Sequence, residues 1–299
     1  MIVTDEKTIP DLSVVIPSYN HARYVPNLLK TLYEQATEFG FEVVLVDSGT
    51  DNSAALIAER FPWVRLVRSE QRLYPGQGRN KGVEIARAPV IAFTDTDCTV
   101  DPHWVDNMVA GVKSGKNVLV GPVLNGTPFS LFGTVDYLLE CFDFWNARNG
   151  VKIGTVGTGN VCFRREIFET HGPLDGFVKG SDSRFFRKVL AAGETIWWLR
   201  GVKVWHHNRT QFRVVMKNQY KLGLGAAATG RTHKSRAQFM MKYPVFVPLI
   251  PVLRYIRIGW ILARKAPLYF ISYVLLTPLI LVGLCVHATG FVKGAFGKE

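Results

Sequence analysis

The chain has 299 residues, enough for one sizeable hydrophobic core and a smaller extension. Its formal charge of +12, from 36 Lys and Arg against 24 Asp and Glu, suits nucleic acid, an anionic lipid surface or a phosphorylated substrate. No standard nucleic-acid-reading module occurs, and many basic residues lie from Arg184 onward, near an apolar tail. The charge therefore indicates membrane lipid, and not nucleic acid, as a partner.

Cysteine usage and the first residues indicate the compartment. Four widely spaced cysteines contain no Cys-x-x-Cys pair, which argues against a zinc site or a disulfide framework and fits a reducing compartment. Residues 1–10 are polar, so no signal peptide is expected before the first strand. We therefore expect the catalytic part to face the cytosol at the cell (inner) membrane.

Short apolar runs alternate with helix-like stretches over the first part of the chain. The patterns predict strands at 12–17, 42–46, 64–67 and 90–94, and helices at 24–38, 53–61 and 77–88. Such alternation implies an α/β fold with a mostly parallel, Rossmann-like sheet and helices on both faces. Ligands bind beyond the carboxyl ends of the strands in such sheets, where Asn20, Asp47 and Asp95 are expected.

The remainder of the chain is divided by composition. The pattern from 101 to about 205 is less regular and richer in Gly and aromatic residues, and we predict one catalytic domain at 1–205. Residues 206–242 form a basic, partly helical connector, with a helix expected from 212 to 222. Residues 243–299 form a membrane-associated tail.

The tail contains two apolar segments. Residues 266–289 carry no Asp, Glu, Lys or Arg and, at about 1.5 Å per residue, could cross the roughly 30 Å hydrocarbon core as one helix. Residues 244–263 are interrupted by Arg254 and Arg257, which suits the membrane interface. If both segments crossed, the basic pair at 264–265 would lie outside the cytosol, against the positive-inside bias. We predict an interfacial segment 244–263 and a spanning helix 266–289.

The triplet Asp95-Thr96-Asp97 is the sharpest local signal of chemistry. Two carboxylates at i and i+2, just past a buried strand, can bind a hard divalent cation such as Mn²⁺ or Mg²⁺. Such a cation bridges diphosphate oxygens and offsets the charge of a departing nucleotide. A turn or a helix cap is the simpler interpretation of the triplet by itself.

Five segments in chain order resemble glycosyltransferase family 2, a group of inverting enzymes with the A-type glycosyltransferase fold. They are VVIPSYN (14–20), VLVDSGTDNS (44–53), GQGRNKGVEIARAPVIAFTDTDC (76–98), GTGNVCFRREIF (157–168) and GSDSRFFRKVLAAGETIWWL (180–199). Together they cover most of residues 12–200. The chain resembles a membrane-attached, bacterial-type member of that family.

The resemblance implies roles for individual residues. A nucleotide-sugar donor would be bound by Pro17, Tyr19, Asn20, Asp47, Arg79 and Asp95. Asp95 and Asp97 would also bind the metal ion that bridges the diphosphate. Asp182 would be the general base that takes the proton of the acceptor hydroxyl, a contribution of about 10²–10⁴ in rate. A helix N-cap is the alternative role for Asp182, and both roles can hold at once.

The predicted site includes further candidate residues, and at two positions the sequence departs from the pattern of the family. Some A-type relatives use a late histidine as a third metal ligand, and His206 is the candidate for that role here. The alternative is that His206 is an ordinary polar residue at the end of a strand. Asn160, Trp197 and Trp198 are acceptor-side candidates, although core packing is the alternative for the tryptophans. The family often has acidic residues where Ser48 and Ser181 stand here, which affects nucleobase choice and acceptor orientation.

Three functions compete. The first is sugar transfer to a saccharide or glycolipid hydroxyl, in cell-surface polysaccharide or glycolipid synthesis. The second is polyprenyl-phosphate sugar synthesis, which needs no general base because the acceptor is already ionised. The third is an inactive membrane scaffold, against which the intact Asp95, Asp97 and Asp182 argue. The absence of a P-loop and of a Gly-x-Ser-x-Gly elbow argues against a P-loop nucleotide site and a hydrolase. The sequence favours the first function because Asp182 supplies the base that a hydroxyl acceptor needs.

Overall fold

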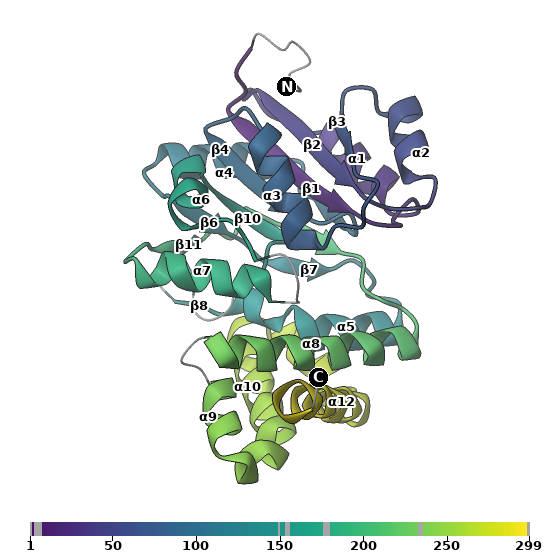
Figure 1. Cartoon of the computed structure of the whole chain (residues 1–299), viewed down its shortest axis with the longest axis vertical. Helices are drawn as coiled ribbons and strands as arrows, with labels where there is room; N and C mark the ends of the chain where they lie inside the picture. Colours follow the sequence, from purple (N-terminus) through teal and green to yellow (C-terminus); the bar gives the residue numbers. More distant parts are fainter. Residues whose placement is uncertain are drawn as a thin grey trace. The chain divides into compact units, whose positions relative to one another are not determined.

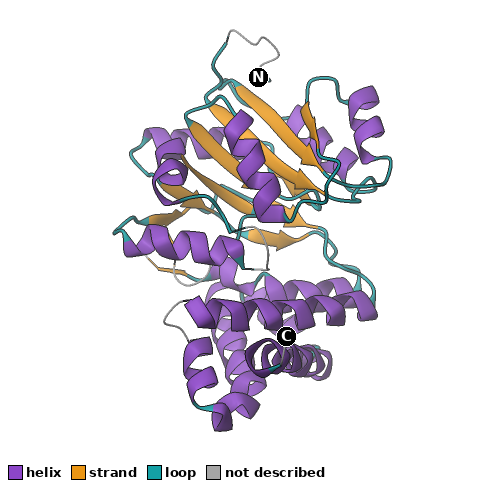
Figure 2. Cartoon of the chain, in the orientation of Figure 1, coloured by secondary structure: helices purple, strands orange, loops and turns teal. Residues whose placement is uncertain are grey.

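The computed structural model describes residues 2, 8–148, 150–152, 156–175, 180–232 and 236–297. The chain divides into two compact units. The sheet unit contains residues 1–126, 147–177 and 181–207, and the helical unit contains residues 127–146, 178–180 and 208–299. Figures 1 and 2 show the helices and strands of both units.

Two sheets form the centre of the sheet unit. Among the described residues, the larger sheet has the strand order β3-β2-β1-β4-β10-β6-β11-β9-β8 and the smaller one β5-β12-β7. The strands of the larger sheet are β1 (Leu12–Ser18), β2 (Phe41–Asp47), β3 (Arg65–Arg68), β4 (Val90–Thr94), β6 (Val118–Val120), β8 (Ala147–Arg148), β9 (Val151–Lys152), β10 (Asn160–Arg164) and β11 (Ile196–Trp198). The smaller sheet consists of β5 (Cys98–Val100), β7 (Val123–Asn125) and β12 (Val204–His206).

Helices cover both faces of the larger sheet (Figure 1). They are α1 (Val25–Tyr33), α2 (Ser53–Arg60), α3 (Pro75–Ile85), α4 (Trp104–Lys113), α6 (Arg165–His171) and α7 (Ser181–Ala191). Helices α3, α6 and α7 share one core with the strands, in which Phe93 and Phe163 meet edge to face with ring centroids 5.0 Å apart. Helix α4 packs on the opposite face, where a Cβ on Gly111 would lie 2.6 Å from Leu119. Burying both faces explains why the strands are continuous apolar runs.

The predicted alternation of strands and helices is confirmed. Strands β3, β2, β1 and β4 are parallel, whereas β10 lies antiparallel between β4 and β6, which the alternation did not reveal. The predicted helix 24–38 ends at Tyr33. Its continuation is prevented by Gln35, whose side chain donates to the Asp101 carbonyl at 2.8 Å and accepts from the Val105 N–H at 2.9 Å. A tertiary contact therefore overrides helix propensity at this point.

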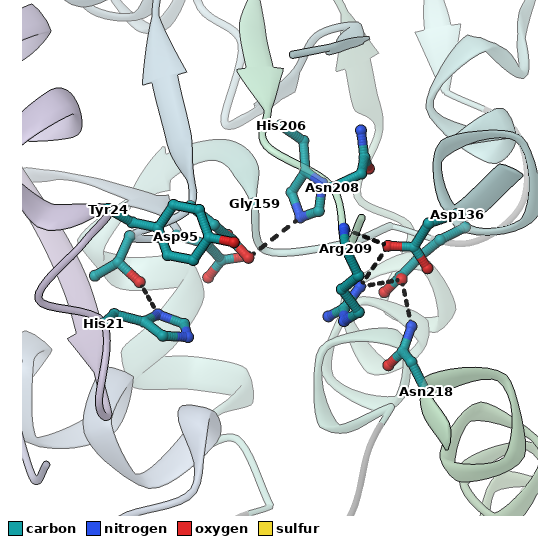
Figure 3. A network of polar contacts seen from close by, with 12 residues as sticks. His21, Tyr24, Asp95, Asp136, Gly159, His206, Asn208, Arg209 and Asn218 are labelled. Carbon is teal, nitrogen blue, oxygen red and sulfur yellow. Dashed lines mark hydrogen bonds and ion pairs between the residues drawn. The ribbon is translucent and has the colours of Figure 1, made fainter. Parts of the chain in front are cut away.

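The helical unit includes a segment that the sequence had assigned to the catalytic domain. Its helices are α5 (Leu131–Glu140), η1 (Phe142–Trp145), α8 (Phe212–Thr232), α9 (Arg236–Lys242), η2 (Pro244–Leu249), α10 (Ile250–Lys265), α11 (Pro267–Leu275) and α12 (Thr277–Phe296). On α5, Asp136 and Glu140 each accept from Arg209 at 2.9 Å, and Glu140 also accepts from Asn218 at 2.7 Å (Figure 3). These contacts join residues 127–146 to α8, so the unbroken domain predicted at 1–205 is interrupted.

The predicted single helix over 266–289 is wrong, because the chain breaks between α11 and α12. Helix α11 ends at Leu275, and α12 begins at Thr277 and continues to Phe296. Pro278 has no backbone N–H, and its ring disfavours a helical conformation before it, so one helix cannot continue through this point. By length and composition, two described segments could cross a membrane, Pro244–Lys265 and Thr277–Phe296.

Candidate active site

Asn20 connects the loops that follow β1 and β2. Its backbone has a φ of 56°, and its side-chain oxygen accepts from the N–H groups of Thr50 at 2.7 Å and Asp51 at 3.2 Å. A Cβ on Gly49 would lie 2.6 Å from the Asn20 nitrogen, so only glycine allows this approach. Asn20 follows the predicted strand, and its oxygen joins the loops that follow β1 and β2.

Asp47 also lies at a strand end, but its carboxylate is turned inward. The side chain is fully buried and forms an ion pair with Arg68, which also donates to the Gly49 carbonyl at 3.1 Å. A contact between Asp47 and a base or ribose therefore stays a prediction, and it requires Arg68 to share or release the carboxylate. Arg68 was not identified from the sequence, because nothing in a basic residue at a strand end marks it as a partner.

Tyr19 and Pro17 lie beside α3 and the loop before it. The Arg72 guanidinium lies 4.4 Å from the centre of the Tyr19 ring, within the range of a cation–π contact. A Cβ on Gly78 would lie 3.1 Å from the Pro17 Cβ, so α3 packs closely on the end of β1. The exposed Arg72, which the sequence analysis missed, is thus a neighbour of the predicted base pocket.

Arg79 and Asp95 form the centre of the site. Arg79 is only 3% exposed, and its guanidinium forms an ion pair with the Asp95 carboxylate. The Arg79 Nε is buried and has no hydrogen-bond partner among the described residues. Asp95 keeps 34% of its side chain exposed, and Gly159 lies beside it (Figure 3). The pair therefore combines a buried cation with an accessible carboxylate.

Asp97 and His206 face one another across two neighbouring strands. Strands β5 and β12 pair antiparallel, with Cys98 opposite His206, and the His207 N–H donates to the Asp97 carbonyl at 2.7 Å. The His206 Nε2 lies 3.6 Å from the Asp97 Oδ2, which is the dashed contact at His206 in Figure 3. The described residues contain no group of three or more His, Cys, Asp or Glu placed to hold a metal ion. Asp97 and His206 thus form a two-donor site at most.

Asp182 is the second residue of α7, which begins at Ser181, so it lies in the first turn and not at the N-cap position that was the alternative. Its carboxylate accepts from the Ser183 N–H at 2.7 Å and from the Thr158 N–H. Burial raises the pKa of Asp182, and the Asp95 charge adds to this, while Arg79 opposes it. Thr158 donates to Asp182, and a Cβ on the next residue, Gly159, would lie 3.2 Å from the Asp95 carboxylate, so Asp182 and Asp95 border the same short loop.

The close approach of α3 and α7 depends on a glycine. A Cβ on Gly76, in the first turn of α3, would lie 3.0 Å from the Asp175 carbonyl and 3.2 Å from the Ser181 Oγ. A larger residue would push the two helices apart at the point from which Arg79 and Asp182 extend. Neither helix shows this requirement in its sequence, because the contact joins segments far apart in the chain.

Asn160 lies in the core and not at an acceptor surface, which corrects its predicted role. The side chain is fully buried and accepts from the Trp104 Nε1 at 3.0 Å. Its amide donates to the carbonyls of Pro122 at 3.2 Å and Val202 at 2.9 Å. Asn160 therefore connects the two sheets of this unit.

We predict that Asn160→Ala lowers stability more than it lowers catalysis. The substitution leaves buried polar groups without partners, and we expect a loss of about 3 kcal/mol in the free energy of unfolding. Denaturant unfolding measures it, with the exposed Asn27→Ala as a control that changes little. Normal stability together with a loss of sugar transfer would instead restore the acceptor role.

The two tryptophans on β11 also make contacts other than those expected of acceptor-side residues. Trp198 packs against the main core cluster. The Trp197 ring lies 5.6 Å from the Lys116 ammonium, and Lys116 precedes β6, which runs parallel to β4. Lys116 therefore lies at the opposite edge of the sheet from Asp95. The packing alternative describes both tryptophans better than acceptor binding.

A histidine that the sequence analysis passed over lies in the same group of loops. The His21 Nδ1 and the Thr96 Oγ1 form a hydrogen bond, so the loop after β1 is joined to the middle residue of the acidic triplet (Figure 3). The only sequence signal was its place beside Asn20. This bond helps to fix the triplet between its two carboxylates.

Comparison with protein families gives one match of large extent. The model described as "Glycosyl transferase family 2" matches residues 13–172, more than half of the chain. Among curated proteins, glycosyltransferase AglE of Haloferax volcanii is 24% identical over 225 residues, which are 73% of this chain and 73% of that protein. Glycosyltransferase AglD of the same organism is 31% identical over 36% of this chain and 18% of its own length.

Solved structures share the fold. The mannosyltransferase PcManGT from Pyrobaculum calidifontis, in complex with GDP-Man and Mn²⁺, has a TM-score of 0.61 at 20% identity and covers 100% of this chain and 90% of its own. S. aureus TarS 1–349 in complex with UDP-GlcNAc has a TM-score of 0.54 at 18% identity, over 97% of this chain and 93% of its own.

Proposed function

The chain belongs to glycosyl transferase family 2 and is a glycosyltransferase, and on that premise we propose that it moves a sugar, with inversion, from a nucleoside-diphosphate sugar to a hydroxyl of a saccharide or glycolipid. One observation carries this proposal. Asp182 from α7 accepts from the Thr158 N–H, and the next residue, Gly159, lies beside the Asp95 carboxylate that pairs with Arg79 from α3. A base, a cation and an acidic loop thus converge from three distant segments.

The donor is bound at the carboxyl ends of β1, β2 and β4. The similar solved structures hold GDP-Man and UDP-GlcNAc, which supports a nucleotide-sugar donor without deciding the base or the sugar. Tyr19 and Pro17 form one wall of the base pocket, and Asn20 and Asp47 fix its loops. Arg79 holds Asp95 in place, and both lie next to the diphosphate.

Asp182 acts as the general base. Attack of the acceptor oxygen on the anomeric carbon requires the hydroxyl proton to leave, and the Asp182 carboxylate accepts it while the nucleotide departs from the opposite face. Burial raises the pKa of Asp182, which makes its carboxylate a stronger base than an exposed aspartate. The N–H groups of Ser183 and Thr158 hold the carboxylate in place, and its remaining lone pairs accept the proton of the acceptor hydroxyl.

The donor set fits a hard or borderline divalent cation. Asp97 and His206 supply one carboxylate oxygen and one imidazole nitrogen that lie 3.6 Å apart, a combination that suits Mn²⁺. Mg²⁺ is also compatible, because proteins often bind it through only one or two carboxylates together with the phosphates of the substrate. Asp95 is the third predicted ligand, although one of its oxygens contacts Arg79. When bound, such a cation offsets negative charge on the diphosphate. Asp97 and His206 would hold it, and the Asp97 carbonyl bond to His207 keeps them in register.

The acceptor and the membrane complete the proposal. A hydroxyl acceptor needs a base such as Asp182, whereas an ionised phosphate acceptor does not, and this favours a saccharide or glycolipid. The helical unit associates with membrane lipid through its two apolar segments. Cys98, Cys141 and Cys162 are buried, Cys285 is exposed, and none of the four forms a disulfide, which fits the reducing cytosol.

A panel of nucleotide sugars tests the function. The purified full chain in detergent is expected to hydrolyse or transfer from one GDP- or UDP-linked sugar only when Mn²⁺ or Mg²⁺ is present. Release of the nucleotide is measured with each donor, with and without a chelator. Equal turnover in the chelator would contradict the metal role, and no turnover with any donor would contradict the proposed donor class.

A further inference from the structure

The part of the helical unit that follows residue 207 is rich in exposed apolar side chains and in basic residues. From residue 208 to residue 298 the sequence contains fourteen Lys and Arg and no Asp or Glu. Large apolar side chains are exposed along η2, α10 and α11, including Val245 at 78%, Ile256 at 60%, Leu268 at 81% and Leu275 at 75%. Soluble proteins rarely expose so many apolar side chains together, and their cationic rim complements anionic lipid headgroups.

The apolar and basic groups are interleaved on α10. Leu253, Ile256 and Trp260 line a groove of about 370 Å³ together with Arg236 and Arg257. The Arg264 guanidinium lies 3.6 Å from the centre of the Trp260 ring. Tryptophan and arginine of this kind gather at the boundary between headgroups and hydrocarbon, where the ring is buried and the charge stays wet. Helix α10 therefore suits a position along the interface.

Neither α10 nor α11 is suited to crossing the bilayer alone. Helix α11 has 9 residues, which at about 1.5 Å per residue spans less than half of the hydrocarbon core. Helix α10 with the preceding η2 forms the 22-residue segment Pro244–Lys265, which is long enough to cross, but Arg254 and Arg257 near its middle disfavour a place in the hydrocarbon core. The longest apolar helix that remains is α12.

Helix α12 does not stand alone, because α8 lies against it over several turns. A Cβ on Gly283 would lie 3.6 Å from Met216, one on Gly290 would lie 2.9 Å from the Tyr220 carbonyl carbon, and one on Gly294 would lie 2.9 Å from Ala227. The contacts advance together along both helices, so α8 and α12 run side by side in the same direction. Any tilt of α12 is therefore shared by α8.

Helix α8 carries exposed charges at the level of the middle of α12. Arg213, Lys217 and Lys221 are exposed at i, i+4 and i+8, on one face. If α12 crossed the bilayer, Lys217 and Lys221 would be carried into its hydrocarbon centre, where lysine is among the least favourable residues. If the pair lies along the surface, the same lysines reach the headgroups or water.

We infer that the helical unit binds one leaflet of an anionic membrane from a single side, with the apolar face of η2, α10 and α11 embedded and no helix crossing the bilayer. This inference rests on the proposed membrane association and replaces the spanning helix expected from composition. Both ends of α12 then lie on the same side of the membrane as the sheet unit. The transfer reaction would take place at that surface.

Labelling of single cysteines with a membrane-impermeant maleimide tests sidedness. The full chain carries Cys285→Ser, so that only buried cysteines remain. One new cysteine is then added: Lys30→Cys on the sheet unit, Lys265→Cys at the last residue of α10, or Lys293→Cys near the end of α12. In sealed vesicles that expose the Lys30→Cys site, all three sites are expected to react before detergent is added. Reaction at 265 or 293 only after detergent would overturn the inference, since it places a helix across the bilayer.

Partitioning into vesicles tests the embedded face. The full chain is expected to bind phosphatidylcholine vesicles containing phosphatidylglycerol at least about tenfold more tightly than pure phosphatidylcholine vesicles. Ile256→Glu on α10 is expected to weaken this binding, whereas Tyr33→Glu, at a similarly exposed apolar position on α1, is not. Equal effects of both substitutions, or no binding to either vesicle, would overturn the inference. Donor hydrolysis by the same samples reports separately on the proposed function.

Discussion

Asp182→Asn is expected to lower the rate of sugar transfer by about 10²–10⁴ while the protein stays folded, because the amide cannot accept the proton of the acceptor hydroxyl. Its oxygen can still accept from the Ser183 N–H, so the start of α7 keeps its contact. Steady-state transfer with a fixed donor and acceptor measures the loss. Glu166→Gln, which neutralises an exposed carboxylate on α6, is the matched control and should retain full activity.

The stability of the same variant separates catalysis from folding. Burial raises the pKa of Asp182 above its unfolded value, so the folded state binds the proton more tightly. The ionised carboxylate therefore costs stability above the unfolded pKa, and this cost disappears as the pH falls below it. At neutral pH, Asp182→Asn removes that cost, and the Tm should be unchanged or higher. A lower Tm that accounts for the lost activity would contradict the role of a base.

The pH dependence of the wild-type reaction gives a second check on Asp182. As the pH falls through the raised pKa of Asp182, the base becomes protonated and kcat/KM should fall in proportion. The acid limb is expected above the pH at which an ordinary aspartate, with a pKa of about 3.9, titrates. Measurement of kcat/KM against pH with saturating Mn²⁺ locates it. An acid limb that persists unchanged in the residual activity of Asp182→Asn would assign it to another group.

Asp97→Asn is expected to weaken Mn²⁺ binding in the presence of the nucleotide diphosphate by at least about 10–100-fold, and to lower donor turnover accordingly. That range is typical for the loss of a residue that only supports a metal ligand, so the loss of a ligand should reach or exceed it. Calorimetric titration of Mn²⁺ with GDP or UDP measures affinity independently of turnover. His206→Ala should weaken the same binding, since its Nε2 faces the Asp97 carboxylate.

The control for the metal site is a carboxylate just beyond β5. Asp101→Asn removes a charge that lies beside Lys203 at 3.7 Å and away from His206. It should leave Mn²⁺ affinity unchanged. If Asp97→Asn and Asp101→Asn affect Mn²⁺ binding equally, the effect is one of overall charge, and Asp97 and His206 are not the ligands.

The alternation of strands and helices, and the acidic triplet after β4, could be read from the sequence because they follow from local patterns. A buried parallel strand is a continuous apolar run, and a ligand-binding loop follows its carboxyl end. Strand β4 was predicted with its observed bounds, and Asp95 directly follows it. Five ordered motifs were then sufficient to identify the family that the comparison with family models supports.

The roles of individual side chains depended on contacts that no local pattern contains. Asn160 follows Gly159 in a segment that resembles an acceptor-side motif, yet its amide connects Trp104, Pro122 and Val202 in the core. Asp47 is at the expected strand end, but the position of Arg68 turns its carboxylate inward. In both cases the partner comes from another strand or helix, so only the packed structure decides whether the polar group faces a ligand or the protein.

What the sequence determined by itself was the composition of each segment: apolar strands, an acidic loop, and a tail that is apolar and basic. Only the tertiary structure decided which of these segments meet. Pro278 divides the apolar tail, α8 lies along α12 with its lysines outward, and α3 and α7 approach at Gly76. The physical reason is that hydrophobicity and backbone preference are local properties, whereas burial, ion pairing and membrane depth depend on neighbours that are distant in the chain.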